Sequence, residues 1–176
     1  KKLSKPLSHN FKQADSTIIL IGKTFGHIEQ SCYLIENYSI TDGMPPEINL
    51  LNEKNNGENL LKLIDKNLIL SAHDISNGGL ITALSEMSLT SDFGAKIYKP
   101  KKLTNLFKYF FGEDQARYII EIQTQKLPIV EKILKESNIY YENIGLTQEN
   151  YFEIEGELKI STKDLFKINN QWYNNY

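Results

Sequence analysis

Three short apolar runs limit most strongly what this chain can fold into. They occupy residues 16–23 (STIILIGK), 68–73 (LILSAH) and 117–123 (RYIIEIQ), and each is rich in Ile or Leu. Apolar runs of this length, bounded by turn-forming residues, are typical of buried β-strands. Because amphipathic helical patterns lie between them without strict alternation, we predict an α+β fold: a single domain with a mixed β-sheet flanked by helices.

The other elements follow from periodicity and turn signals, and Asn55-Asn56-Gly57 is expected to delay the first long helix. A short helix is expected to begin within residues 26–35. Longer helices are predicted over residues 50–66, 78–89, 103–111 and 127–136, and a last one from 164 toward Trp172. Shorter strands are predicted over residues 95–98, 140–146, 151–154 and 158–160.

The polar N-terminal segment differs from the rest of the chain. We interpret residues 1–15 as a connection from an upstream domain and residues 16–176 as the folded domain. The chain has no initiator Met, which suggests a fragment or a processed product. A length of 176 residues suits one domain of ordinary size.

Charge and cysteine content exclude several classes of protein. Twenty basic residues against 22 acidic ones give a net charge of −2, which argues against binding of nucleic acid through a broad basic surface. The single cysteine, Cys32, forms no internal disulfide and is interpreted as a small core residue, so a cytoplasmic location is expected. No apolar run reaches the roughly 18 residues that span a bilayer, so no membrane partner is expected.

The stretch SAHDISNGGL at residues 71–80 carries the most chemical information. It predicts a strand, a tight turn and a helix start, an arrangement whose backbone N–H groups bind phosphate. Asp74 is a candidate Mg²⁺ ligand at the strand end. The alternative stays open that Ser76 only caps the helix and that Gly78 and Gly79 only permit the turn.

Several segments together resemble a known family. HDISNGGL followed by ALSEM closely resembles a signature of bacterial phosphoribosylformylglycinamidine synthases, in the C-terminal domain of the large synthetase component. Four further segments resemble motifs of that family in the same order: residues 26–34 (GHIEQSCYL), 45–50 (PPEINL), 111–118 (FGEDQARY) and 144–154. The resemblance covers nearly the whole chain.

Three positions depart from the family pattern. Glu29 stands where the family usually has Gly, Asn77 where it has Asp, and Asp114 where it has Ser. Asn77 keeps the capacity to cap or ligate without the charge. Glu29 is the more disruptive change if the usual Gly adopts a positive φ or approaches a ligand.

The resemblance implies a role in purine synthesis. The family is an ATP-dependent, C–N bond-forming ligase that converts formylglycinamide ribonucleotide and ammonia into formylglycinamidine ribonucleotide. The resemblance implies ATP and Mg²⁺ as cofactors of the complete enzyme. It also implies four kinds of partner: the remaining synthetase domains, a glutaminase subunit that supplies ammonia from glutamine, a small accessory subunit, and the ribonucleotide substrate. Since this chain resembles only the last of four domains, it is expected to be inactive alone.

The resemblance also implies where ligands would bind. No catalytic residue is transferred to this chain, and His73 is expected to form only a strand-end hydrogen bond. Three alternatives to a direct role in this synthetase stay open: a non-catalytic scaffold, an auxiliary-nucleotide domain, or another enzyme of the AIR synthase superfamily. By the family's internal symmetry, the candidate phosphate- or nucleotide-binding residues are Ser76, Asn77, Gly78, Gly79, Glu113 and Gln115, with Asp74 as the metal ligand. Read without the family, Glu113 and Arg117 are a plain surface pair if that segment is helical.

Overall fold

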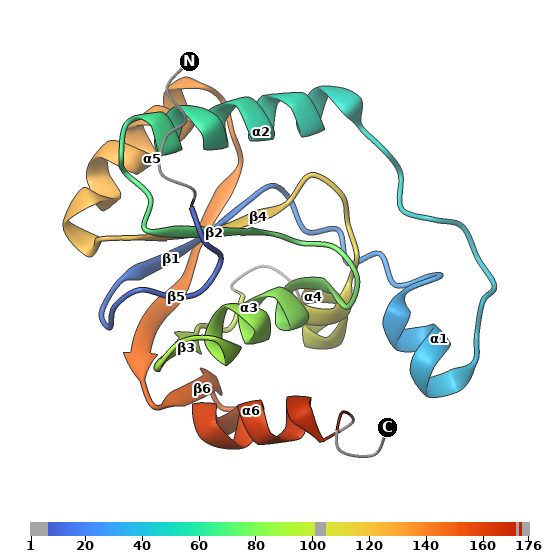
Figure 1. Cartoon of the computed structure of the whole chain (residues 1–176). Helices are drawn as coiled ribbons and strands as arrows, with labels where there is room; N and C mark the ends of the chain where they lie inside the picture. The colour runs from blue at the N-terminus through green and yellow to red at the C-terminus, as the bar shows by residue number, and fades with distance from the viewer. Residues whose placement is uncertain (1–6, 101–104, 172, 174–176) are drawn as a thin grey trace.

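The computed structural model describes residues 7–100, 105–171 and 173. Within them, one seven-stranded sheet runs through the molecule in the order β2-β4-β1-β5-β3-β6-β7 (Figure 1). All neighbouring strands pair antiparallel except β3 and β6, which are parallel, so the predicted mixed sheet is confirmed. The strands are β1 (Thr17–Ile21), β2 (Ser71–Asp74), β3 (Phe93–Ile97), β4 (Tyr118–Ile122), β5 (Tyr141–Glu149), β6 (Tyr151–Ile154) and β7 (Leu158–Ser161).

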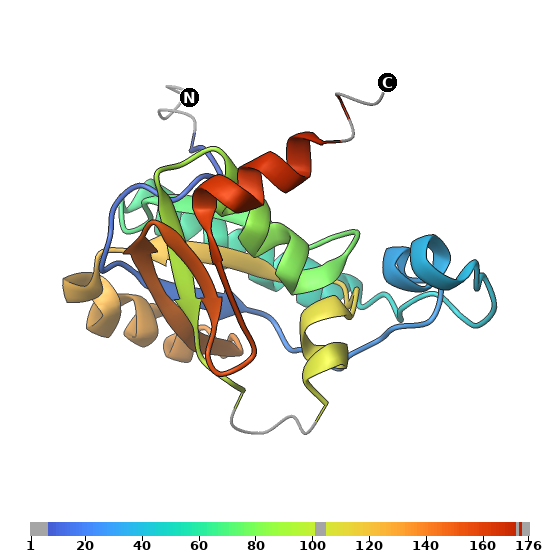
Figure 2. The same ribbon diagram turned by 90° about the horizontal axis from the view of Figure 1, so that it is seen from below.

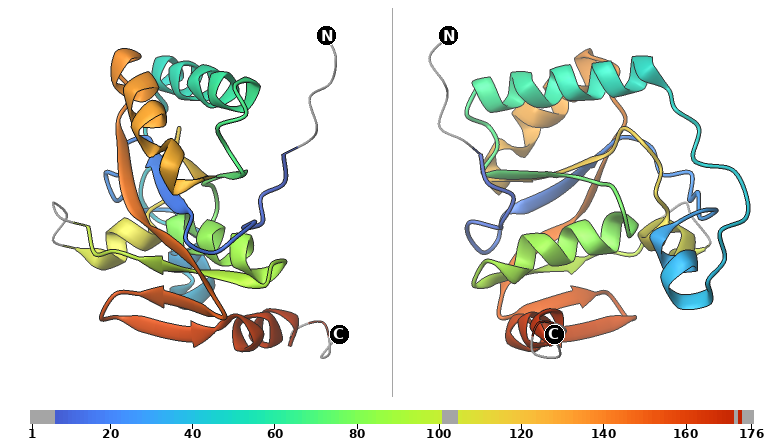
Figure 3. Two further views of the ribbon diagram at one scale, coloured as in Figure 1. Left: turned by 90° about the vertical axis from the view of Figure 1, so that its left-hand side faces the viewer. Right: turned by 45° about the vertical axis from the view of Figure 1, so that its right-hand side comes forward.

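Helices cover both faces of the sheet. The helices α2 and α5 lie over one face and α3 and α4 over the other, while α6 lies beyond α3 (Figures 1 and 3). The short helix α1 lies to one side of these layers, next to α4, as Figures 1 and 2 show. The described helices are α1 (Cys32–Tyr38), α2 (Leu50–Asp65), α3 (Gly79–Leu89), α4 (Leu106–Phe111), α5 (Leu127–Glu136) and α6 (Thr162–Asn170), with a 3₁₀ turn at Thr124–Lys126.

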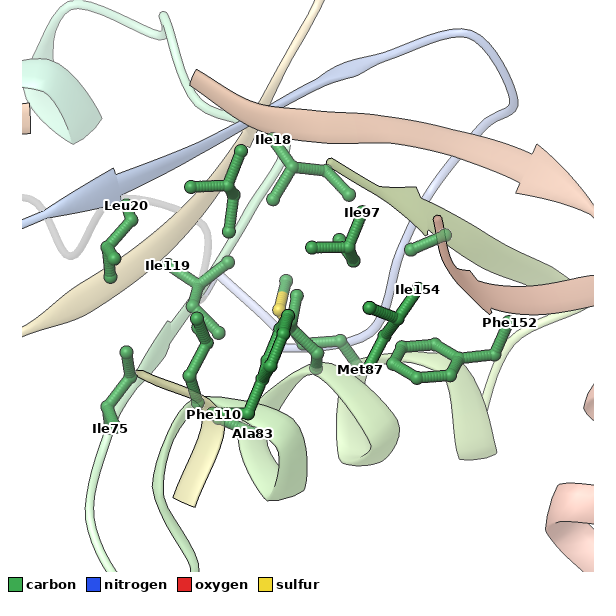
Figure 4. Close-up of a cluster of buried hydrophobic side chains, with 14 of the residues drawn as sticks. Ile18, Leu20, Ile75, Ala83, Met87, Ile97, Phe110, Ile119, Phe152 and Ile154 are labelled. Atoms are coloured by element: carbon green, nitrogen blue, oxygen red, sulfur yellow. The ribbon is translucent and has the colours of Figure 1, made fainter. Parts of the chain in front are cut away.

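The strand β1 is buried on both faces, and this produces two hydrophobic cores. Successive side chains of a strand point to opposite faces. Ile18 and Leu20 therefore pack with α3 and α4 in one cluster, whose residues Figure 4 shows around Ala83 and Met87. Ile19 and Ile21 pack in the second cluster with residues of α2 and α5. Full burial on both faces explains why the run at 16–23 is continuously apolar.

Most element boundaries agree with those predicted, with a few differences. Asn49 caps α2 through a hydrogen bond from Asn52 N–H, and the helix then continues through Gly57 without delay. The burial of Asn56, whose amide donates to Ala116 O at 2.8 Å, offsets the weak helix propensity there. The strand β3 already begins at Phe93, where a turn was predicted. Of the other predicted bounds, residues 103–104 and Trp172 lie outside the described residues.

The end of the polar N-terminal segment is part of the fold. Phe11 is 2% exposed and belongs to the α3-side core, and its N–H donates to Met87 O at 3.0 Å. Lys12 N–H donates to the buried carboxylate of Glu121 at 2.9 Å. The expected boundary at residue 15 therefore falls inside a packed segment, while residues 1–6 lie outside the described residues. Within the described residues, the helices are all too short or too polar to cross a membrane.

Candidate functional site

The strand–turn–helix predicted around residues 71–80 is present. The strand β2 ends at Asp74 and α3 begins at Gly79, with Gly78 and Gly79 both at positive φ (78° and 72°). A Cβ on Gly79 would lie 2.6 Å from Gly112 O, so a side chain there would collide with backbone. The tight approach of this turn to the segment after α4 therefore requires glycine.

Ser76 does not cap α3, contrary to the open alternative. The N-cap residue is Gly78, which has no side chain of its own to accept a hydrogen bond from the first turn of α3. Ser76 instead uses its backbone carbonyl, which accepts the Gly79 N–H at 3.1 Å. The glycine turn is thus closed by backbone atoms, and its side chains at Ser76 and Asn77 are exposed.

The start of α3 binds an anion that this chain itself supplies. Oε1 of Glu113 accepts the N–H of Gly78 at 2.7 Å and the N–H of Cys32 at 2.8 Å. A carboxylate is favoured at a helix N-terminus for the same reasons as a phosphate, because the amides and the helix dipole attract negative charge. Glu113 therefore joins the first turns of α1 and α3, and a phosphate at Gly78 must displace it.

The adjacent Asp114 holds a second loop. Its Oδ2 accepts the N–H groups of Phe25 and Gly26 at 3.0 and 2.9 Å, and its Oδ1 accepts that of His27 at 3.1 Å. Only 4% of Asp114 is exposed. The family's usual Ser has one hydroxyl oxygen, whereas this carboxylate has two oxygens for three donors. Asp114 thus satisfies three backbone donors of this loop in the present chain.

Arg117 completes the cluster from inside the protein. It is 1% exposed, and Nη2, Nε and Nη1 donate to Gly112 O, Asp114 O and Thr24 Oγ1 at 2.6, 3.1 and 3.2 Å. Its Nη1 lies 3.9 Å from Asp114 Oδ2. Burial lowers the pKa of Arg117, and the Asp114 carboxylate opposes that shift. The condition for a surface pair of Glu113 and Arg117, a helical segment, is not met, and the buried Arg117 lies next to Asp114 instead.

The candidate metal ligand Asp74 lies at the solvent-facing end of β2. Its side chain is 70% exposed, and its Oδ1 lies 3.4 Å from Nδ1 of His73. His73 Nε2 lies 3.0 Å from Oε2 of Glu86, about two turns into α3. Within the described ranges, no three His, Cys, Asp or Glu side chains converge as a metal site. The donors around Asp74 therefore do not fit a complete Mg²⁺ site made by this chain alone.

The remaining candidates lie near one another but do not converge on a cavity. Gln115 is exposed, and its amide reaches back to Glu113 O at 3.5 Å. A hollow of about 690 Å³ does exist, but at the other end of α3. It is lined by residues of the N-terminal segment, the α3–β3 turn and α6, including Phe11, Lys12 and Phe166. This hollow is thus separate from the glycine turn.

Cys32 is the first residue of α1, and its thiol is partly buried. Partial burial, together with the nearby Glu113 carboxylate, raises the pKa of this thiol. A raised pKa keeps the thiol protonated and poorly nucleophilic at neutral pH. Because its side chain is only partly buried, Cys32 is not the small core residue that was expected, and what it contributes to the site is its backbone N–H.

Comparison with known protein families identifies the fold. The family model described as "AIR synthase related protein, C-terminal domain" matches residues 13–155. The chain belongs to this family.

Curated relatives of this AIR synthase related domain agree with the motif resemblance. The chain is 46% identical over 176 residues to the phosphoribosylformylglycinamidine synthase subunit PurL of Pelagibacter ubique, covering 100% of this chain and 24% of the relative. It is 34% identical over 166 residues to PurL of Rhodopseudomonas palustris, covering 94% of this chain and 23% of the relative. The resemblance stated from the motifs is confirmed, and the chain spans about a quarter of the length of these relatives.

Solved structures support the same fold. Thermotoga maritima PurL complexed with FGAR superposes with a TM-score of 0.72 at 15% identity, over 91% of this chain and 29% of that one. The same protein complexed with ATP gives a TM-score of 0.68 at 15% identity, over 91% and 27%. At such low identity these structures show the fold alone, which confirms the predicted α+β class.

Two buried acidic residues that matter here were not predicted as site residues. Asp114 was noted only as a departure from the family, although a charged residue in a glycine-containing turn beside a buried strand was a usable signal. Glu121 lies within the apolar run of β4 and is fully buried, where it accepts hydrogen bonds from Ser71 Oγ and from Lys12 N–H. Neither partner lies near Glu121 in sequence, so no local pattern identified them.

Proposed function

We propose that this chain is the C-terminal domain of a PurL-type phosphoribosylformylglycinamidine synthase. In this role it serves the ATP-dependent conversion of formylglycinamide ribonucleotide and ammonia into formylglycinamidine ribonucleotide. The observation that carries the proposal is the 46% identity to a PurL subunit along the whole chain. The ordered motifs and the family match support the same assignment.

Partners and cofactors follow from the same relatives. A solved structure of PurLQS from Thermotoga maritima supports an assembly with further subunits, which we assign as the glutaminase and the small accessory protein. A solved complex of Thermotoga maritima PurL with ATP supports ATP as a substrate of the complete enzyme. We assign Mg²⁺ and most ATP ligands to the other domains, because Asp74 has no complete ligand set around it here.

Within the synthetase, this chain's own residues act chiefly by fixing loops. Glu113 occupies the amide of Gly78, and Asp114 occupies three amides at residues 25–27. This favours the scaffold role over an auxiliary nucleotide site built on Ser76, Asn77, Gly78, Gly79, Glu113 and Gln115. A nucleotide phosphate binds this turn only if the Glu113 carboxylate withdraws.

A chimeric synthetase tests the function. The C-terminal quarter of the Pelagibacter ubique PurL is replaced by this chain, and ADP release from ATP is followed with formylglycinamide ribonucleotide and ammonia. We expect activity within about tenfold of the parent enzyme, and none from this chain alone. A chimera that is folded by circular dichroism but has no turnover would overturn the assignment to this synthetase. Turnover by the chain alone would overturn the scaffold role.

A further inference from the structure

The segment from residue 25 to residue 51, which we call the acidic arm, has an unusual charge distribution. No Lys or Arg occurs between Lys23 and Lys54, although the chain as a whole has nearly equal numbers of basic and acidic residues. The arm carries four carboxylates, at Glu29, Glu36, Asp42 and Glu47. All four residues are exposed. The arm therefore presents one sign of charge to its surroundings.

The same segment also exposes large apolar side chains. Phe25, Met44, Ile48, Leu50 and Leu51 are each between 65% and 77% exposed. None of the residues of α1, in the middle of the arm, is buried. Scattered apolar residues on a surface are normal, but four of these five lie within residues 44–51, and such a concentration of large exposed apolar side chains in one segment is typical of an interaction surface. Figures 1 and 2 show this part of the chain extending away from the layered sheet.

Side chains at the base of the arm fix the loop that carries Met44. Glu29 Oε2 accepts Met44 N–H at 2.9 Å, and Gln30 Nε2 donates to Gly43 O at 2.6 Å. His27 Nε2 lies 2.8 Å from Met44 O. Gly43 has a φ of 105°, and a Cβ there would lie 2.6 Å from Glu29 Oε2. Glu29, the residue that departs from the family's usual Gly, thus shapes this loop.

The helix of the arm is anchored as well. The ring of Tyr33 in α1 packs against those of Phe107 and Phe111 in α4, with centroid distances of 4.6 and 4.7 Å. Glu113 accepts the N–H of Cys32 at the start of α1, as described above. A surface held in one conformation before binding loses less conformational entropy when a partner docks.

We propose that the acidic arm docks this domain onto the preceding part of the PurL-type synthetase, in an apolar groove rimmed by Lys and Arg. The inference rests on the proposed function. Two observations favour the preceding part of the synthetase as the partner. About three quarters of the length of the matching relatives lies outside this chain. The arm carries charge of one sign, and basic groups on a partner surface would complement it. The five apolar side chains supply the buried centre of the interface and the carboxylates its polar rim.

Zero-length carbodiimide crosslinking of the chimeric synthetase tests the docking. This reagent joins a carboxylate directly to a neighbouring lysine. We expect mass spectrometry to find Glu36, Asp42 or Glu47 joined to lysines upstream of this domain in the same polypeptide. Glu136 on α5 is the matched control, because its carboxylate is similarly exposed and lies 3.8 Å from Lys132 Nζ, so only that local product is expected.

A double substitution tests the apolar component. Met44→Lys with Leu50→Lys places cations where the groove is expected to be basic, and we expect the upstream crosslinks to fall at least tenfold. Ile129→Lys, at a 50% exposed position on α5, is the control and leaves them unchanged. In this chain alone, neither variant shifts the thermal unfolding midpoint, because the substituted side chains are exposed.

The outcomes separate this inference from the proposed function. Crosslinks to a second copy or to the glutaminase, or none beyond this domain, would overturn the docking even in an active chimera. Upstream crosslinks that the double substitution leaves intact would also overturn it. Conversely, an inactive chimera that still shows the upstream crosslinks supports the docking and contradicts the proposed function.

Discussion

Two pairs of carboxylates near the glycine turn differ in their surroundings: one pair faces the protein interior and the other faces solvent. Glu113 and Asp114 point into the protein, where they accept five backbone N–H groups from three loops. Asp74 and Glu86 lie at the end of β2 and on α3, and their carboxylates remain largely exposed next to His73. Residue type alone does not distinguish a carboxylate that holds a fold together from one that is available to a ligand. The two kinds of carboxylate are distinguished by the number of backbone N–H groups that each one accepts.

Removal of Asp114 should have the largest effect. Asp114→Ala leaves three N–H groups without their acceptor and Arg117 buried without its carboxylate. Breaking a buried ion pair from one side costs about 3–5 kcal/mol. We expect a loss of that size in the free energy of unfolding of this chain, measured by urea denaturation. Asp114→Asn, which keeps one acceptor oxygen, should lose clearly less, and equal losses would contradict the account.

Substitution of Glu113 should have an intermediate effect. Glu113→Ala leaves the N–H groups of Gly78 and Cys32 unsatisfied, at a cost of about 1–3 kcal/mol. It also frees the turn for an external anion, so NMR titration with Mg–ADP should shift the amides of Ser76 to Leu80 in the variant. The wild-type domain serves as the control and should show much smaller shifts at these amides. Equal shifts in both proteins would mean that Glu113 does not block the turn.

Glu121 is a buried carboxylate whose hydrogen-bond donors are a hydroxyl and backbone N–H groups, and the pH dependence of the free energy of unfolding should show this. Burial raises its pKa above the ordinary value of 4.5, and hydrogen bonds from Ser71, Lys12 and Gln13 oppose that shift. Because the pKa is raised in the folded state, the carboxyl group contributes its full stability below pH 4.5. That contribution is lost as the pH rises through the folded-state pKa. The unfolding free energy of the wild type minus that of Glu121→Gln should therefore fall as pH increases above 4.5. A pKa difference of one is worth about 1.4 kcal/mol.

Urea denaturation of both proteins between pH 4 and pH 8 measures this difference, because titration of the other groups cancels between them. A difference that rises with pH would show that the hydrogen bonds outweigh burial and that the folded-state pKa of Glu121 is depressed.

Asp74 should give the smallest effect. Its carboxylate is 70% exposed, and its Oδ1 lies 3.4 Å from His73 Nδ1. Substitutions at such positions usually change stability by less than about 0.5 kcal/mol. Asp74→Asn should therefore leave the unfolding of this chain unchanged within that range. A loss as large as that of Glu113→Ala would place Asp74 among the structural carboxylates and would remove the contrast drawn above.

Patterns local in sequence predicted the fold well. The continuous apolar run at β1 indicated a buried strand, and the glycine pair at 78–79 indicated the strand–turn–helix. The partners of the acidic residues were not predictable in this way. Asp114 binds residues about 90 positions earlier in the chain, and Glu121 binds Lys12, because the fold brings these segments together. No local periodicity encodes such contacts, and the exposed arm has no apolar spacing that distinguishes it from a loop.

The position of β1 in the sheet has a consequence for biosynthesis. Thr17 pairs with Ile122 on one side and with Leu146 on the other, so the first strand to be made is completed by some of the last. Such long sequence separations slow folding, since large loops must close before any pairing is rewarded. On the ribosome, β1 keeps both hydrogen-bonding edges open until most of this chain has emerged. Unpaired strand edges attract other strands, so this domain depends on protection from aggregation during translation.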